Sequence, residues 1–92
     1  MIKSFQHKGL QKFYEKGTTV GIQGKHKKRL RLQLIALDTA TCIDDMELPG
    51  FDLHELKGKR KGIYAIKVSG NWRITFKFEE GNVYIVNYED YH

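Results

Sequence analysis

Five residues in the second half of the chain carry groups that transfer protons or bind phosphate. They are His54, Lys57, Arg73, Tyr91 and His92. An imidazole exchanges protons in either direction near neutral pH, and an arginine presents a planar fork that binds phosphate through two hydrogen bonds. For each residue alone, a structural or solvated role is at least as good an explanation as a chemical one, so only the whole set points to chemistry.

As a set, these groups match the needs of metal-independent RNA cleavage. A base removes the proton from the ribose 2′-OH, and that oxygen then attacks the adjacent phosphorus in line. Cations stabilise the charge that gathers on the phosphate oxygens, and an acid protonates the departing 5′ oxygen. The set supplies two histidines, a tyrosine, a lysine and an arginine, without paired catalytic carboxylates. DNA lacks the 2′-OH and would not be cleaved by this route.

The loop LKGKRKG, residues 56–62, concentrates positive charge between two glycines. Its cations are Lys57, Lys59, Arg60 and Lys61. We predict that they contact RNA or the ribosome, although a solvated basic hairpin explains them about equally well. A metal site built from His54, Asp90 and His92 has no support from HxxxH or CxxC spacing. We therefore expect no metal and no other cofactor.

Composition limits the class of protein. A chain of 92 residues is expected to form one domain, residues 1–92. Its apolar content of 40% is enough for a compact core, and its net charge of +5 favours a polyanionic or acidic partner. The single cysteine, Cys42, suits a reducing compartment, and we expect it to be packed. The charged opening segment predicts neither a signal peptide nor a membrane span, and hence a cytoplasmic protein.

The first half of the chain has helical periodicity. Leu10, Phe13 and Tyr14 share one face of a predicted helix that ends at Gly17, because glycine readily adopts the left-handed cap conformation. A second helix is predicted within KHKKRLRLQLIALDTAT. Its apolar stripe consists of Leu30, Leu34, Leu37 and Thr41, with Ile35 beside it.

The second half changes to strand periodicity. In WRITFKF, apolar residues alternate with Arg73, Thr75 and Lys77. Turn signals at residues 69–71 and 80–82 join this strand to IYAIKV before it and VYIVNY after it, as an antiparallel meander. FDLHEL can add a fourth strand, and residues 2–5 can pair at an edge.

Helices followed by strands favour an α+β fold, in which two N-terminal helices pack on one face of a small antiparallel sheet. The opposite face can then remain polar and open. Regular alternation would place His54 and Lys57 on opposite faces. The strand must therefore end, bend or bulge between them if both serve one site.

Three motifs occur together in a characteristic order: LHxLKGxRxG, then GNWRITF, then the terminal YEDYH. The stretch LHELKGKRKGIYAIKVSGNWRITFKFEEGNVYIVNYEDYH resembles the C-terminal half of HigB-type toxins of the RelE/ParE superfamily. MIKSFQHKGLQKFYEKG resembles their N-terminus, so the similarity spans nearly the whole chain. The resemblance implies a RelE-like fold and a ribosome-dependent mRNA interferase that cleaves mRNA in the A site, inhibiting translation and growth. It also implies an adjacent-encoded, HigA-like helix-turn-helix antitoxin, through which the complex binds operator DNA indirectly.

The same resemblance implies roles for individual residues. Arg73 and Lys57 match positions expected to bind the phosphate. His54 and His92 match the expected proton carriers, and Tyr91 is expected to stack on or hydrogen-bond the nucleotide. The partners implied are the 70S ribosome, mRNA and the antitoxin, without a membrane.

Two other functions are compatible with these residues. One is a ParE-like toxin that inhibits DNA gyrase without nuclease activity, and the other is a non-catalytic RNA-binding module. A fold alone does not distinguish them, but a pure binding toxin needs no proton-transfer groups beside a cationic patch. Position 59 is often acidic in HigB-type toxins, and Lys59 makes this loop more basic.

Overall fold

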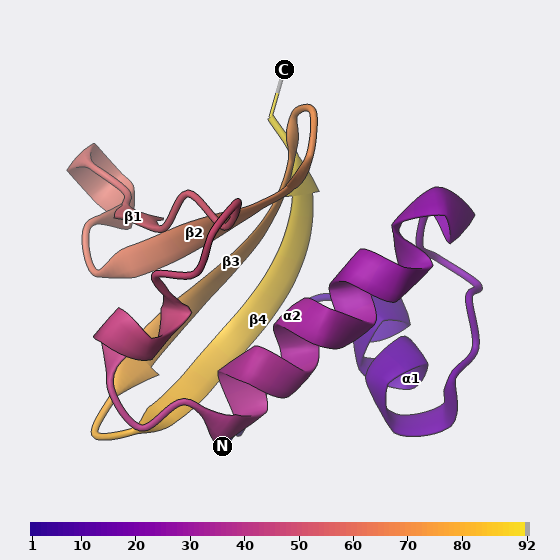
Figure 1. Cartoon of the computed structure of the whole chain (residues 1–92), viewed down its shortest axis with the longest axis horizontal. Helices are drawn as coiled ribbons and strands as arrows, with labels where there is room; N and C mark the ends of the chain where they lie inside the picture. The colour runs from indigo at the N-terminus through magenta and orange to yellow at the C-terminus, as the bar shows by residue number, and fades with distance from the viewer. Residues whose placement is uncertain (92) are drawn as a thin grey trace.

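A four-stranded antiparallel sheet forms the centre of the computed structural model, which describes residues 1–91 (Figure 1). Its strands are β1 (His54–Glu55), β2 (Ile63–Ser69), β3 (Trp72–Glu79) and β4 (Asn82–Asp90). They lie in the order β1-β2-β3-β4. The predicted meander and the positions of both its turns are therefore confirmed.

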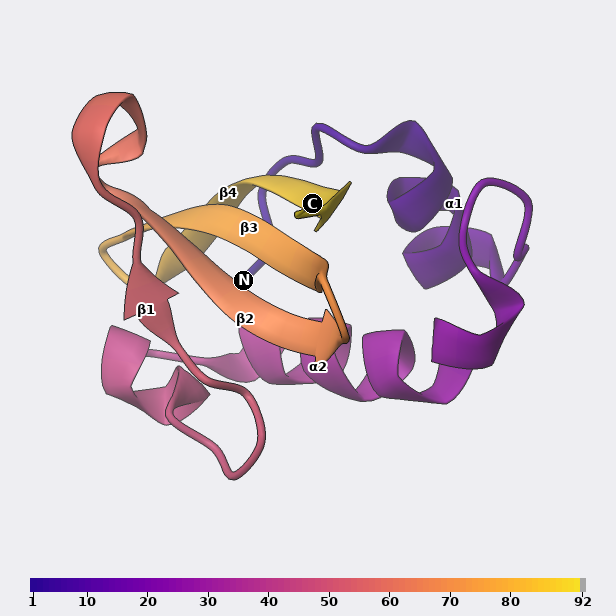
Figure 2. The same ribbon diagram turned by 90° about the horizontal axis from the view of Figure 1, so that it is seen from above.

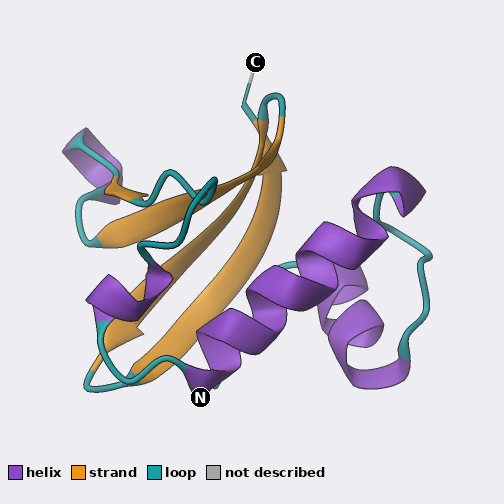
Figure 3. Cartoon of the chain, viewed as in Figure 1, coloured by secondary structure: helices purple, strands orange, loops and turns teal. Residues whose placement is uncertain are grey.

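The first strand is shorter than FDLHEL suggested. Asp52 has a positive φ of 50°, and β1 covers only two residues. The 3₁₀ turn η3 (Gly58–Arg60) follows after Leu56 and Lys57 and carries the chain out of the sheet (Figure 3). The strand thus ends between His54 and Lys57, so the regular alternation that would place them on opposite faces does not continue to Lys57.

Strand β4 contains a bulge that regular alternation does not predict. The register shifts where Thr75 pairs with Asn87 but Lys77 pairs with Tyr84, and Ile85 has a positive φ of 50°. The extra residue turns Ile85 outward and lets both Val83 and Val86 enter the core. Beyond the bulge, the odd-numbered residues of β4 face the side of the sheet away from the core.

Two helices accompany the sheet. Helix α1 (Lys8–Lys16) begins where His7 Nδ1 accepts a hydrogen bond of 2.9 Å from the Leu10 N–H, and it ends at Gly17, as predicted. Helix α2 (Lys27–Thr39) runs along one face of the sheet, whereas α1 lies to the side, next to α2 (Figures 1 and 2). The α+β class and the antiparallel sheet are confirmed. The placement of both helices directly on one face is not.

The core combines both helices with β2, β3 and β4. Its buried residues include Leu10, Phe13, Leu30, Leu34, Leu37, Ile66, Ile74, Phe76, Val83 and Val86. The parallel bridges of Ile2 with Val83 and of Phe5 with Val86 confirm the predicted pairing of residues 2–5 at the sheet edge. Within residues 1–91, no helix is long and apolar enough to cross a membrane.

Three details of α2 and the segment after it differ from the prediction. The helix ends at Thr39, so Thr41 lies outside its buried stripe and is exposed. Ile35 is 50% exposed, whereas Gln33 is buried, and its side-chain amide nitrogen donates to the Lys67 carbonyl over 2.7 Å. The prediction of a packed Cys42 is wrong, because this residue is exposed where η2 (Ile43–Met46) begins.

A buried aromatic cluster joins the start of α2 to the sheet. His26 is 3% exposed, its Nδ1 lies 2.6 Å from the Tyr88 hydroxyl, and the Tyr88 ring stacks on Trp72 with centroids 4.4 Å apart. Burial, with the positive charge of Lys25, lowers the pKa of His26 below its ordinary value of 6.5. The folded protein therefore binds a proton here less readily than the unfolded chain does.

We expect the free energy of unfolding to be highest above about pH 6.5 and to fall as the pH drops below that value. Below it, His26 binds a proton in the unfolded chain but not as readily in the folded protein, which favours unfolding. His7 adds to this effect, because burial lowers its pKa too. Urea unfolding at several pH values between 5 and 8 would measure it. His26→Gln should reduce the slope, and His54→Gln, at an exposed position, should retain it. An unchanged slope in His26→Gln would contradict the assignment.

Candidate active site

The register of the sheet places the residues on the face away from the core in two rows. One row consists of His54, Ala65, Thr75 and Asn87. The other consists of Lys67, Arg73 and Glu89. Directly opposed residues of neighbouring strands point to the same side, so His54 shares a face with Arg73 although 18 residues separate them in the sequence. With strands about 4.8 Å apart, the His54 and Thr75 backbones are about 10 Å apart.

His54 is exposed, and its ring is held by one contact. Its Nδ1 lies 2.9 Å from the carbonyl oxygen of Asp52. A carbonyl only accepts hydrogen bonds, so Nδ1 carries the proton of the neutral ring and Nε2 keeps a free lone pair. Nε2 can therefore take a proton from a hydroxyl group brought to this face.

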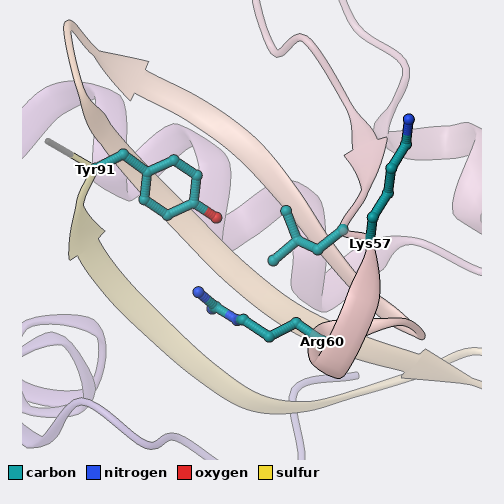
Figure 4. A pocket seen from close by; sticks show the side chains of 4 residues that line it. Lys57, Arg60 and Tyr91 are labelled. Atoms are coloured by element: carbon teal, nitrogen blue, oxygen red, sulfur yellow. The ribbon is translucent and has the colours of Figure 1, made fainter.

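The end of β4 closes one side of an open pocket of about 490 Å³. The pocket is lined by Leu56, Lys57, Arg60 and Tyr91 (Figure 4). Arg60 extends towards Tyr91, whereas the ammonium end of Lys57 points away from it. Lys57 also borders a second pocket of about 320 Å³, which includes Lys61. The structure thus brings Arg60, and not the ammonium group of Lys57, next to the tyrosine.

Tyr91 lies near two arginines, Arg60 and Arg73. The Arg73 Cζ is 5.6 Å from the centroid of the Tyr91 ring, a cation–π arrangement. The backbone N–H of Tyr91 donates to the Asn71 carbonyl over 2.8 Å, which fixes this end of the chain to the β2–β3 turn. Burial raises the pKa of the Tyr91 hydroxyl, and the charge of Arg60 offsets only part of that effect. Tyr91 is therefore a neutral phenol that can donate a hydrogen bond.

Arg73 is oriented by the same turn. Its Nη1 donates to the carbonyls of Gly70, over 2.7 Å, and of Trp72, over 3.0 Å. Four buried side-chain atoms among residues 1–91 have no hydrogen-bond partner: two of them, Arg73 Nε and Tyr91 Oη, lie in this region, and the others are His26 Nε2 and Gln33 Oε1. Two unsatisfied polar atoms so close to a pocket can be satisfied by an anionic, hydrogen-bonding ligand.

Glu89 was not among the candidate residues from the sequence. Its carboxylate accepts two hydrogen bonds from Arg60, of 3.0 Å and 2.5 Å, and one of 2.6 Å from the Thr75 hydroxyl. Burial raises the pKa of Glu89, but the hydrogen bonds from Arg60 and Thr75 outweigh it, so the net shift is downward. The signal in the sequence is its place two residues before Tyr91, a spacing at which the side chains of an extended chain point to the same side.

The predicted residues therefore differ in how closely they gather. Arg73 and Tyr91 are in contact, and His54 lies on the same face across two strands. Lys59 and Lys61 are exposed beside Arg60 in the loop around η3. His92 lies outside the described residues, so its prediction is not tested. Within residues 1–91, no group of three or more His, Cys, Asp and Glu residues is placed to hold a metal ion.

This arrangement can bind a phosphate, stack a base and accept a proton. Arg60 and Arg73 place positive charge near an aromatic ring, which suits the backbone and bases of single-stranded nucleic acid. His54 contributes a ring nitrogen able to act as a base on the same face.

Known proteins match the chain over its whole length. A family model described as RelE-like toxin of type II toxin-antitoxin system HigB matches residues 3–92. Endoribonuclease HigB of Proteus vulgaris is 51% identical over 92 residues, which are 100% of both chains.

Solved structures resemble the fold. The YoeB-YefM complex from Staphylococcus aureus has a TM-score of 0.65 at 15% identity, over 100% of this chain and 95% of that chain. A YafQ mutant from E. coli has a TM-score of 0.59 at 20% identity, over 98% of this chain and 91% of that chain. At these identities the likeness concerns the fold alone.

Proposed function

Because the chain belongs to the HigB family of RelE-like toxins of type II toxin–antitoxin systems, we propose that it is a toxin with mRNA endoribonuclease activity. The observation that carries this proposal is the contact of Arg73 and Tyr91 beside Arg60, on the open face that also bears His54. Full-length similarity to an Endoribonuclease HigB supports the same activity. The gyrase-inhibitor alternative is not favoured by the family or by this relative.

The proposed reaction needs no metal. His54 Nε2 takes the proton of the ribose 2′-OH, and the 2′ oxygen attacks the phosphorus in line. The Arg73 guanidinium stabilises the charge on the phosphate oxygens. The bond to the 5′ oxygen breaks, and His92 protonates that oxygen. The products are a 2′,3′-cyclic phosphate and a 5′-OH end.

Tyr91 and the basic loop complete the proposed site. The neutral phenol ring stacks on a base next to the cut, with its hydroxyl free to donate. Lys59, Arg60 and Lys61 contact the backbone of RNA in the ribosome. Lys57 is proposed to bind the phosphate, for which its exposed side chain must turn towards Tyr91.

The proposed cellular setting follows from the family. A type II toxin is paired with a protein antitoxin, and we propose one of the HigA helix-turn-helix class, which carries the complex to operator DNA. The toxin acts in the cytoplasm, on mRNA held in the A site of the 70S ribosome. The ribosome supplies the in-line substrate geometry that an isolated RNA does not maintain.

Mapping the 5′ ends of a message on programmed ribosomes tests this function. Toxin stripped of bound metal with a chelator beforehand, and then added to ribosomes in their Mg²⁺ buffer, should produce cuts within the A-site codon, and the same message without ribosomes should serve as the comparison. Folded toxin that stops growth and produces no cuts would overturn the nuclease proposal. DNA supercoiling by gyrase would then be the next assay.

A further inference from the structure

A hydrogen-bonded network joins three separate segments beside Tyr91. Both terminal nitrogens of Arg60, from η3, donate to Glu89 on β4, and the Thr75 hydroxyl on β3 donates to the same Glu89 oxygen that Arg60 Nη2 contacts. Thr75 is 2% exposed, so the network is anchored within the sheet. From this geometry we propose that Glu89 is a positioning residue, which holds the Arg60 guanidinium in the pocket to bind the RNA phosphate.

Arg60 needs such an anchor because its own loop provides little packing. None of the residues of η3 is buried, and segments with few buried contacts move most readily. A long arginine side chain there would sample many rotamers, at an entropic cost whenever it binds a ligand. The two-point contact with Glu89 removes that freedom before the RNA arrives.

The contact leaves Arg60 able to bind phosphate. A guanidinium has five N–H donors, and Glu89 accepts from two nitrogens, one bond each, which leaves three donors. The Arg60 side chain is still 45% exposed and lines the pocket with Tyr91. A phosphate can therefore bind Arg60 without displacing Glu89.

Two other roles for Glu89 fit the geometry less well. A general base must release its lone pairs to take a proton, but both oxygens of Glu89 are already bonded to cationic or hydroxyl donors. Glu89 could instead block Arg60 until RNA displaces it. A carboxylate with that role would not need to be held in place by the buried Thr75 hydroxyl. Glu89 also faces Arg73 across the strand pair, so its charge offsets the repulsion between the two arginines.

The inference rests on the proposed nuclease function, and two readouts distinguish a failure of the positioning role from a failure of that function. In ribosome cleavage, Glu89→Gln should lower kcat about tenfold. The same change added to Arg60→Ala should cause no further loss, because the two residues act as a unit. Thr75→Val should resemble Glu89→Gln, and Thr75→Ser, which restores a hydroxyl, should recover the wild-type rate.

The second readout needs no activity. NMR of the Arg60 Nε–Hε group should show an ordered side chain in the wild type and a mobile one in Glu89→Gln. Glu79→Gln is the matched control, since it breaks only the exposed Lys77–Glu79 pair of 3.0 Å and should change neither readout.

Three results would overturn the positioning role: faster cleavage by Glu89→Gln, a further loss in the double variant, or an equally ordered Arg60 in Glu89→Gln. If the wild type cleaves nothing, the nuclease proposal fails, and the NMR comparison still decides whether Glu89 holds Arg60.

Discussion

Replacing His54 with alanine is expected to lower the rate of mRNA cleavage about 10²- to 10⁴-fold, the usual contribution of a general base. The expectation follows from the ring orientation, in which the Asp52 carbonyl holds Nδ1 and leaves Nε2 as the acceptor. The side chain is exposed and outside the core, so the fold should remain intact. Single-turnover cleavage on programmed ribosomes, with circular dichroism of each variant, measures both effects.

His54→Gln is the informative control for this prediction. Glutamine keeps a hydrogen-bonding side chain of similar length but does not transfer a proton near neutral pH. It should therefore be as slow as His54→Ala. A His54→Gln protein that cleaves at close to the wild-type rate would assign the base to another residue.

Arg73→Ala is expected to lower the cleavage rate about 10²- to 10³-fold, comparable to the loss of a preorganised donor to a developing oxyanion. Arg73 is held by the Gly70 and Trp72 carbonyls and lies against Tyr91, so its donors are in place before RNA binds. Arg73→Lys keeps the charge but loses the planar fork, and its cleavage rate should lie between those of the wild type and Arg73→Ala. The measurement is again single-turnover cleavage with saturating toxin.

Arg31→Ala provides the matched control for Arg73→Ala. Arg31 also lies over an aromatic ring, with its Cζ 5.4 Å from the Phe13 centroid, but it belongs to α2 and not to the open face of the sheet. Its replacement should leave the rate unchanged. Equal losses in Arg31→Ala and Arg73→Ala would indicate a general electrostatic effect and contradict a specific phosphate site.

The fold was predictable where local patterns decide the structure. Strand alternation around Arg73, the two tight turns and the cap at Gly17 are all confirmed. The bulge at Ile85 was not predictable, because its cause lies in tertiary packing: it lets both Val83 and Val86 reach the core. The position of α1 beside the sheet was also not predictable, since periodicity gives the buried face of a helix but not its position relative to a sheet.

The candidate site was predictable in its residue types more than in its geometry. The motifs shared with HigB-type toxins pointed to Arg73 and Tyr91, which the fold brings together. The role of Glu89 depends on Arg60 folding back from a loop 29 residues away, and no local pattern encodes such a contact. The direction of the Lys57 side chain likewise depends on where β1 ends.

The central claim is cleavage by attack of the 2′-OH at this surface, and one substrate tests it most directly. A message whose A-site nucleotide carries hydrogen in place of the 2′-OH at the cleavage position would be bound to ribosomes and treated with toxin. We expect no cut at that position, while a deoxy substitution one codon upstream leaves cleavage intact. Cleavage of the deoxy position at the normal rate would show that the 2′ oxygen is not the nucleophile, and would overturn the proposed reaction.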